Sequence, residues 1–182
     1  MKIRSALAVL AALTTPLLAQ EPPKPGPEHQ KLMAEVGTWD AVVEMTGQDG
    51  KPMKDTAVSE ITAIGGMWVV DDFKGQIAGG PFHGHGTTGY DPQKGKYVGT
   101  WVDSWSTSVM TTEGTYDAAK KALTMSGMGP GMDGKPVMHR MVTTEKDANT
   151  RVFEMFAPGP DGKEMKIMTI TYTRRAQKGA AK

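Results

Sequence analysis

Aromatic and acidic side chains alternate along residues 97–105. Four candidate ligand-binding residues stand an even number of positions apart: Tyr97, Trp101, Asp103 and Trp105. In an extended strand such residues share one face. If that face points inward, indoles beside a carboxylate form a wall on which a small ligand stacks and is oriented by hydrogen bonding. If it points outward, the same rings cover the surface or an interface.

Two histidines that lie two positions apart are candidate metal ligands. His83 and His85 follow Gly79-Gly80-Pro81 in the sequence, and two imidazoles at this spacing can reach one zinc or copper ion. Such a site needs further ligands, and the neighbouring sequence specifies none. We therefore favour a solvated glycine-rich loop for this segment.

A third histidine, His139, lies in a predicted strand with Val137 and Met141 on its face. A lone histidine in this setting is usually a hydrogen-bonded core residue, and the sharper alternative is an axial haem ligand. Because the sequence shows no other feature of a haem site, we expect no cofactor. His139 remains a candidate ligand-binding residue.

A methionine-rich stretch spans residues 125–132, and its thioethers are the soft ligands that Cu(I) prefers. Met125 and Met128 would face opposite ways in a continuous strand, however. Methionine is also frequent throughout the chain, which contains 14. Packing in the core and turns is therefore the favoured role, and copper binding is the alternative.

Catalytic signatures are scarce in this sequence. It contains no nucleophile elbow, zinc-protease motif or phosphate-binding loop. Asp71 and Asp72 are adjacent, so in a strand they point to opposite faces and cannot flank one glycosidic bond. Glu60, Arg140 and Glu154 could form an internal polar cluster that orients a substrate, or could lie on the wet face. We do not expect an enzyme.

These candidates must be positioned by strands. After a short helix predicted at residues 28–36, with Gly37 as its C-terminal stop, runs rich in Val, Ile, Thr, Met and aromatic residues alternate with turn signals such as Asp-Gly-Lys. This pattern is typical of a hairpin-linked all-β domain. The predicted strands span residues 38–46, 53–64, 67–77, 86–90, 97–105, 108–116, 122–127, 137–145, 150–157 and 165–174.

The composition favours a closed sheet around a cavity. The chain has no cysteine, so disulfides and thiolate metal sites are excluded. Beyond residue 19 the only leucines are Leu32 and Leu123, which leaves adaptable methionine to fill much of the core. Closing the sheet removes its edges, and about ten strands enclose more space than the eight that already hold a small ligand. We predict an antiparallel up-and-down β-barrel.

The first 19 residues have the pattern of a signal peptide. Lys2 and Arg4 precede an apolar stretch from Ala6 to Leu18 that is too short to span a bilayer, and Ala19 is a plausible cleavage residue. We therefore expect an exported protein, periplasmic or secreted, without membrane insertion. A formal net charge of +1 gives no basic field for nucleic acid.

The expected organisation has one folded unit. A proline-rich tether at residues 20–27 follows the signal peptide, the barrel domain occupies residues 28–175, and residues 176–182 form a disordered tail.

Two resemblances support this fold. Gly37-Thr38-Trp39 resembles the Gly-x-Trp signature of lipocalin-type (calycin) barrels. In that family the tryptophan plugs one barrel end and a basic residue of the last strand packs over it, which implies a role for Arg174 or Arg175.

More of the chain resembles the exported bacterial domain-of-unknown-function family numbered 1579. The matching segments are Gly65-Gly66-Met67-Trp68, Phe82-His83-Gly84-His85-Gly86, Gly89-Tyr90-Asp91-Pro92, the stretch 97–104 and Ile170-Thr171-Tyr172-Thr173-Arg174. That family implies a calycin-like barrel and carries no established activity.

The sequence as a whole predicts an exported barrel that binds a small, largely apolar ligand in its interior. The alternatives are a structural or interaction module with a methionine-filled core, a copper-binding or haem-binding barrel, and a barrel enzyme.

Overall fold

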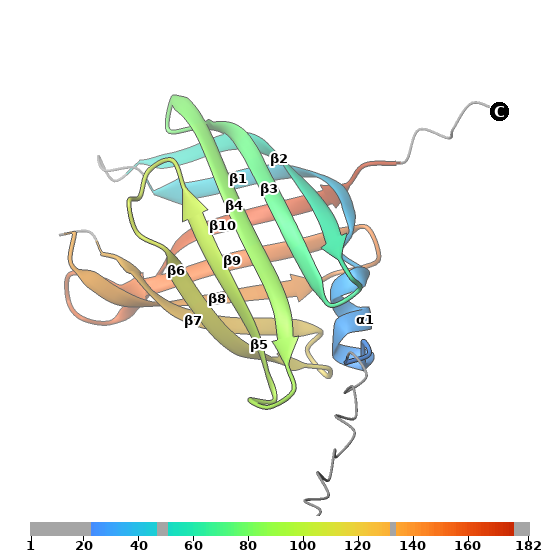
Figure 1. Ribbon diagram of the computed structural model, residues 1–182. Coiled ribbons are helices and arrows are strands. Elements are labelled where there is room, and N and C mark those ends of the chain that lie inside the picture. The colour runs from blue at the N-terminus through green and yellow to red at the C-terminus, as the bar shows by residue number, and fades with distance from the viewer. Residues whose placement is uncertain (1–22, 47–50, 132–133, 177–182) are drawn as a thin grey trace, which may run out of the picture.

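Ten antiparallel strands close into a barrel in the computed structural model (Figure 1), which describes residues 23–46, 51–131 and 134–176. Each strand pairs with its neighbours in sequence, and the first pairs with the last. The predicted fold class, an up-and-down barrel with a short N-terminal helix, is confirmed. The elements are α1 (Pro27–Met33), β1 (Gly37–Thr46), β2 (Pro52–Ile64), β3 (Trp68–Ile77), β4 (Gly80–Asp91), β5 (Lys96–Asp103), β6 (Met110–Asp117), β7 (Ala122–Pro130), β8 (Pro136–Glu145), β9 (Thr150–Pro158) and β10 (Glu164–Arg174).

Strand β4 departs most from the sequence prediction, because it begins at Gly80 instead of at residue 86. The turn before it is formed by Ala78 and Gly79, whose φ angles are 51° and 78°, and alanine rarely adopts this left-handed conformation. Asp55 supports the turn by accepting a hydrogen bond from the Ala78 amide at 2.9 Å. Pro81 is the second residue of the strand, and proline is tolerated in strands mainly at their ends and edges. The solvated loop that we predicted for this segment is therefore wrong.

Helix α1 is also shorter than predicted, and it ends at Met33. Gly37 does not stop the helix; it begins β1 with a φ of 137°. A Cβ at this position would lie 2.7 Å from Nη1 of Arg174. Glycine is therefore required where the helix is joined to the barrel, both for its backbone conformation and for the close approach of an arginine.

Trp39 closes the barrel end that α1 covers. Its indole is 3% exposed and lies between two guanidinium groups, with Arg174 at 4.0 Å and Arg151 at 4.5 Å from the ring centroid. The indole Nε1 donates to the carbonyl of Glu35 at 2.9 Å. Arg174 thus occupies the position that the lipocalin resemblance implied, whereas Arg175 pairs with Asp40 on the outside.

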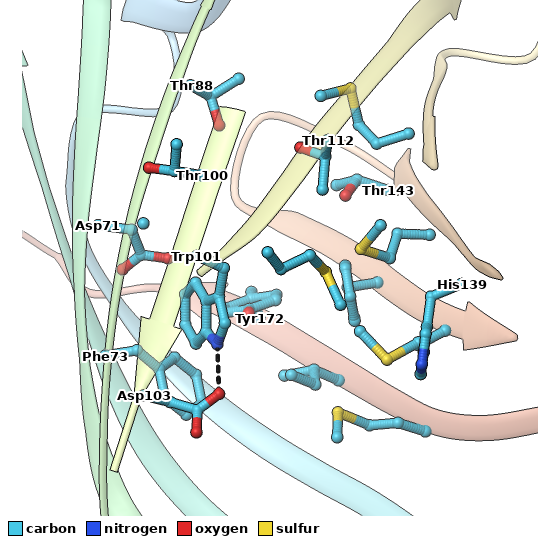
Figure 2. Close-up of a pocket in the computed structure, with 18 of the residues that line it drawn as sticks. Asp71, Phe73, Thr88, Thr100, Trp101, Asp103, Thr112, His139, Thr143 and Tyr172 are labelled. Atoms are coloured by element: carbon cyan, nitrogen blue, oxygen red, sulfur yellow. Dashed lines mark hydrogen bonds between the residues drawn. The ribbon is translucent and has the colours of Figure 1, made fainter. Parts of the chain in front are cut away.

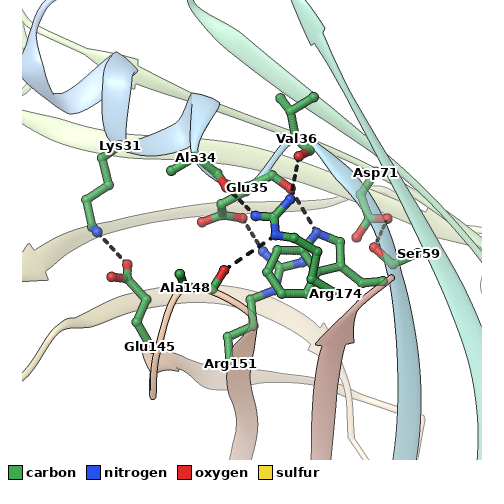
Figure 3. Close-up of polar contacts among 11 residues, drawn as sticks. Lys31, Ala34, Glu35, Val36, Ser59, Asp71, Glu145, Ala148, Arg151 and Arg174 are labelled. Atoms are coloured by element: carbon green, nitrogen blue, oxygen red, sulfur yellow. Dashed lines mark hydrogen bonds and ion pairs between the residues drawn. The ribbon is translucent and has the colours of Figure 1, made fainter. Parts of the chain in front are cut away.

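Arg174 also connects the last strand to the end of α1 (Figure 3). Its Nη1 donates to the carbonyl of Val36 at 2.7 Å, and its Nη2 donates to that of Ala34 at 2.5 Å. The same residue therefore stacks on Trp39 and satisfies carbonyl groups that the helix leaves free. One turn earlier in the helix, Lys31 pairs with Glu145 of β8.

Several expected segments fall outside the described residues: the signal peptide (1–19), the first residues of the tether (20–22) and all of the predicted tail except residue 176. Across the described parts of the chain, no helix has the length and apolar character needed to cross a bilayer.

Replacing Arg174 with methionine should lower the free energy of unfolding by about 2 kcal/mol, because the change removes hydrogen bonds from a charged donor and a cation–π contact. Arg175→Met is the matched control, since it removes only an exposed ion pair with Asp40 and should change stability little. Urea denaturation measures both. Equal losses in the two variants would contradict the role given to Arg174.

Candidate ligand cavity

The barrel encloses a cavity of about 360 Å³, within the range of small-molecule sites. Its walls are mainly apolar and aromatic, and a few polar side chains, among them Asp71, Asp103 and His139, also line it (Figure 2). The interior is therefore not filled by its methionines, as the structural-module alternative required. Residues from the body of the lining are Val43, Ile61, Val69, Phe73, Ile77, Trp101, Met125, Met141, Phe153, Met155, Met168, Ile170 and Tyr172.

Trp101 forms one wall of the cavity. The ring lies against β4 at Gly84 and Gly86, and a Cβ at Gly86 would be only 2.9 Å from the indole Cε3. Glycine on β4 thus leaves room for the ring to lie along the sheet. Phe73 of β3 packs against the same indole edge-to-face, with 6.3 Å between centroids.

Asp103 holds Trp101 in this orientation. The indole Nε1 donates to Oδ2 of Asp103 at 2.9 Å, and Oδ1 accepts from the Trp105 amide at 2.8 Å. Both carboxylate oxygens therefore have donors within the protein. We predicted that Asp103 orients a ligand; the geometry gives it the task of positioning the aromatic wall.

Trp105 and Tyr97 mark opposite ends of the barrel. Strand β5 ends before Trp105, whose side chain lines the cavity, remains 55% exposed and packs edge-to-face on Phe82 at 4.9 Å. We place the mouth at this end. Tyr97 lies beside α1, 4% exposed, with its hydroxyl 3.4 Å from the carbonyl of Glu28. It supports the closed end and does not line the cavity.

A polar floor, defined by Asp71, Ser59, Arg151 and Glu35, lies at the closed end (Figure 3). Ser59 donates to Asp71 at 2.7 Å, and Arg151 pairs with Glu35 at 2.5 Å while stacking on Tyr172 at 4.6 Å.

Burial raises the pKa of the Asp71 carboxyl, against the opposing effects of the Ser59 hydrogen bond and the Arg151 charge. Burial also raises the pKa of the Tyr172 hydroxyl. At this end of the cavity Arg151 is thus paired with Glu35, and Asp71 is hydrogen-bonded to Ser59.

His139 faces the cavity from β8 and is 5% exposed. Its Nε2 lies 3.1 Å from the carbonyl oxygen of Pro130, and its Nδ1 has no hydrogen-bond partner among the described residues. Of the predicted ligand-binding residues, His139, Trp101, Asp103 and Trp105 are therefore brought together around one space.

A row of methionines crosses the interior on consecutive strands. The strand register pairs Met125 with Met141, Met141 with Met155, and Met155 with Met168. All four line the cavity, and directly opposed side chains on one face of a sheet are in contact range. We call Met125, Met141, Met155 and Met168 the methionine row.

Other predicted site residues lie on the outer face. Glu60 is exposed on β2, and Arg140 forms a bidentate pair with Glu164 at 2.8 and 2.6 Å. The wet-face alternative therefore holds for both, and neither is an interior ligand-binding residue, because each neighbours an inward residue and strand alternation turns it outward.

His83 and His85 are exposed on β4, and His83 pairs with Asp72 at 2.5 Å. Among the described residues, no group of three or more His, Cys, Asp or Glu side chains is arranged to hold a metal ion. The methionine-rich stretch does not bring its sulfur atoms to one side of the sheet, because Met125 faces the cavity and Met128 is 49% exposed. Met132 lies outside the described residues.

Sequence reasoning missed the polar floor. Asp71 shares its strand face with Val69 and Phe73, and Arg151 shares its face with Phe153 and Met155. A charged residue on an otherwise apolar face is the signal that could have identified both. Glu35 has no such signal, because its role comes from the short segment between α1 and β1.

Comparison with known proteins assigns a family. The profile of the family described as a protein of unknown function, DUF1579, matches residues 24–174. The chain belongs to this family. No curated protein matches it.

Solved structures agree on the fold. The chain is similar to Rv2717c from M. tuberculosis, with a TM-score of 0.64 and 12% identity over 83% of this chain and 99% of that one. It is also similar to the S-type phycobiliprotein lyase CPES from Guillardia theta, with a TM-score of 0.59 and 10% identity over 82% of this chain and 93% of that one. At such identities the likeness concerns the fold alone.

Replacing Asp71 with asparagine should stabilise the protein at pH 7. A folded-state pKa raised above the reference value of 3.8 means that the ionised carboxylate disfavours folding. This unfavourable contribution is complete above the raised pKa and vanishes as the pH falls below 3.8, so the gain from Asp71→Asn should shrink on acidification. Urea denaturation at pH 7 and pH 4 tests it.

Asp72→Asn is the control of opposite sign on the outer face. Hydrogen bonds from Lys74 and His83 lower the pKa of Asp72, so its carboxylate stabilises the fold above the reference pKa and this contribution is lost as the pH falls through the lowered value. Asp72→Asn should destabilise at pH 7. A change in the free energy of unfolding of the same sign for both variants at pH 7 would rule out the environments assigned to Asp71 and Asp72.

Proposed function

We propose that this DUF1579 protein binds a small, largely apolar molecule inside the barrel and performs no chemistry on it. One observation carries the proposal: a closed barrel retains about 360 Å³ of apolar-walled space, sealed at one end and reached from the other. An unfilled apolar interior of this size forgoes favourable packing. A ligand that fills it regains those contacts, which gives the cavity a reason to exist.

The polar groups around the cavity favour binding over catalysis. Asp103 is engaged by Trp101 and Trp105, and the Arg151 guanidinium is paired with Glu35. The Asp103 carboxylate is therefore not free to act as an acid or a base on a substrate, whereas Nε of Arg151 is buried and has no hydrogen-bond partner among the described residues. Asp71 is the carboxyl with an altered pKa that faces the cavity, and its Ser59 hydrogen bond holds it at the floor.

The polar groups that line the cavity also disfavour haem. His139 is placed to face a ligand, but the propionates of a haem need cationic or solvated partners. Arg151, the cation that lines the cavity in the described part of the chain, is already paired.

Filling the cavity with a larger side chain should weaken binding. Thr143 lines the cavity and Thr144 is turned to the other face of β8, so Thr143→Trp and Thr144→Trp form a matched pair. The neutral naphthalene dye prodan should bind the wild-type protein with enhanced blue-shifted emission. Overpacking should weaken binding to Thr143→Trp by about tenfold or more.

Thr144→Trp should bind the dye about as well as wild type, with thermal unfolding confirming that both variants are folded. Unchanged dye affinity in a folded Thr143→Trp variant, or no dye binding to the wild type, would refute the proposal.

We further propose that the protein is exported. The basic start and apolar stretch of residues 2–18 support cleavage after Ala19. Expression in a bacterial host should give a periplasmic or secreted product whose intact mass corresponds to an N-terminus at Gln20. An uncleaved chain retained in the cytoplasm would contradict export.

A further inference from the structure

Asp71 keeps part of its side chain open to the cavity. It lies on the inward face of β3 between Val69 and Phe73, which are 5% and 3% exposed, whereas Asp71 itself is only half-buried. Because this face of the strand points into the barrel and Asp71 lines the cavity, its accessible surface lies inside the cavity. Figure 2 shows the carboxylate on the same side of the space as Trp101 and Phe73.

One oxygen of this carboxylate has no donor within the described residues. Oδ1 accepts a hydrogen bond from the hydroxyl of Ser59 at 2.7 Å, and Oδ2 accepts none. In the same part of the chain, the fully enclosed side-chain atoms without a hydrogen-bond partner are Nδ1 of His139 and Nε of Arg151. Oδ2 of Asp71 is not one of these enclosed atoms, so a group in the cavity can reach it.

The charges around the cavity favour a cation at this oxygen. Among the described residues, the Asp, Glu, Lys and Arg side chains that line the cavity are Glu35, Asp71, Asp103 and Arg151, three carboxylates and one guanidinium. Arg151 forms its ion pair with Glu35, and indole and amide N–H groups donate to both oxygens of Asp103. The direct partner of Asp71 is a neutral hydroxyl. An anionic ligand would add to this excess of negative charge, whereas a cationic ligand would offset it.

The ligand-free protein holds the Asp71 carboxylate at a cost. Burial raises the pKa of Asp71, and burial followed by the charge of Asp71 raises the pKa of the Tyr172 hydroxyl. An enclosed charge without an ionic partner lowers stability, and such costs are characteristic of functional sites. An ammonium group would supply the missing partner through a charge-assisted hydrogen bond.

The remaining walls suit an apolar body attached to that ammonium group. Trp101 packs edge-to-face on Phe73 beside Asp71 on β3, and the methionine row lines the cavity from β7 to β10. Indole faces attract cations, and thioethers make favourable contacts with aromatic rings.

We infer that the cavity binds a small amine with an apolar body, whose ammonium group donates to Oδ2 of Asp71 while the body packs between Trp101 and the methionine row. The inference rests on the proposed function and specifies the class of ligand. The apolar walls provide the contact area, and the open carboxylate oxygen selects the charged head group.

Three probes with the same rings isolate the head group: 1-naphthylmethylamine, 1-naphthalenemethanol and 1-naphthoic acid. At pH 7 they carry an ammonium, a neutral hydroxyl and a carboxylate. Isothermal titration calorimetry should show that the amine binds about tenfold more tightly than the alcohol, the effect of one charge-assisted hydrogen bond, and that the acid binds most weakly. Transfer out of water alone would favour the neutral alcohol, so apolar burial does not explain a preference for the amine.

Asp71→Asn keeps the shape of the side chain and removes its charge, so the preference for the amine over the alcohol should fall to about onefold. This variant is expected to be more stable than the wild type at pH 7, and thermal unfolding confirms that it is folded. Asp72→Asn, the same change on the outer face of β3, should retain the tenfold preference. A further measurement needs no variant: the side-chain carboxylate ¹³C resonance of Asp71 in the wild type should shift with the amine and move little with the alcohol.

Equal affinities of the amine and the alcohol in the wild type, or a preference that persists in folded Asp71→Asn, would overturn the inference while leaving the binding cavity in place. The same holds if prodan binds and the amine does not. Failure of prodan to bind the wild type would overturn the proposed function itself.

Discussion

The stacking of Trp39 between Arg174 and Arg151 is the interaction on which the structure depends. One guanidinium comes from β10 and the other from β9, while the indole belongs to β1 and is hydrogen-bonded to the segment that follows α1. The contact thus joins the first strand to the last two and holds the helix against the barrel end. It adds side-chain contacts to the backbone pairing of β1 with β10 that closes the sheet, and it seals one end of the cavity.

Because one end is sealed, the two ends of the interior differ in polarity. Arg151 brings a positive charge into an enclosed place, and Glu35 neutralises it at the floor. Polar groups are thereby gathered beneath the helix, where Ser59 bonds to Asp71 and Arg151 pairs with Glu35, and the apolar walls extend from there to the mouth beside Trp105. Nδ1 of His139, on the wall of the cavity, is buried and has no hydrogen-bond partner in the part of the chain that the structure describes.

The walls combine rigid and adaptable surfaces. Trp101 is held flat on β4 by glycine beneath it and by Asp103 at its nitrogen, so its position is set before any ligand arrives. The methionine row on the facing strands has unbranched side chains that can change rotamer at little cost. A rigid aromatic wall thus faces a yielding thioether wall.

The sequence by itself predicted about ten strands and a closed fold, because alternation and turn residues are properties of contiguous segments. The contact of Trp39 with a basic residue of the last strand was implied by the resemblance of Gly37-Thr38-Trp39 to the lipocalin signature. It also placed Asp71 and Asp72 on opposite faces. Only the tertiary structure decided which face of each strand is inner, and it places Glu60 and Arg140 on the outer face. It also showed that His83 belongs to a strand. Partners such as Arg151 and Glu35 lie 116 positions apart, and the spacing within a single segment carries no information about contacts that form only when the sheet closes.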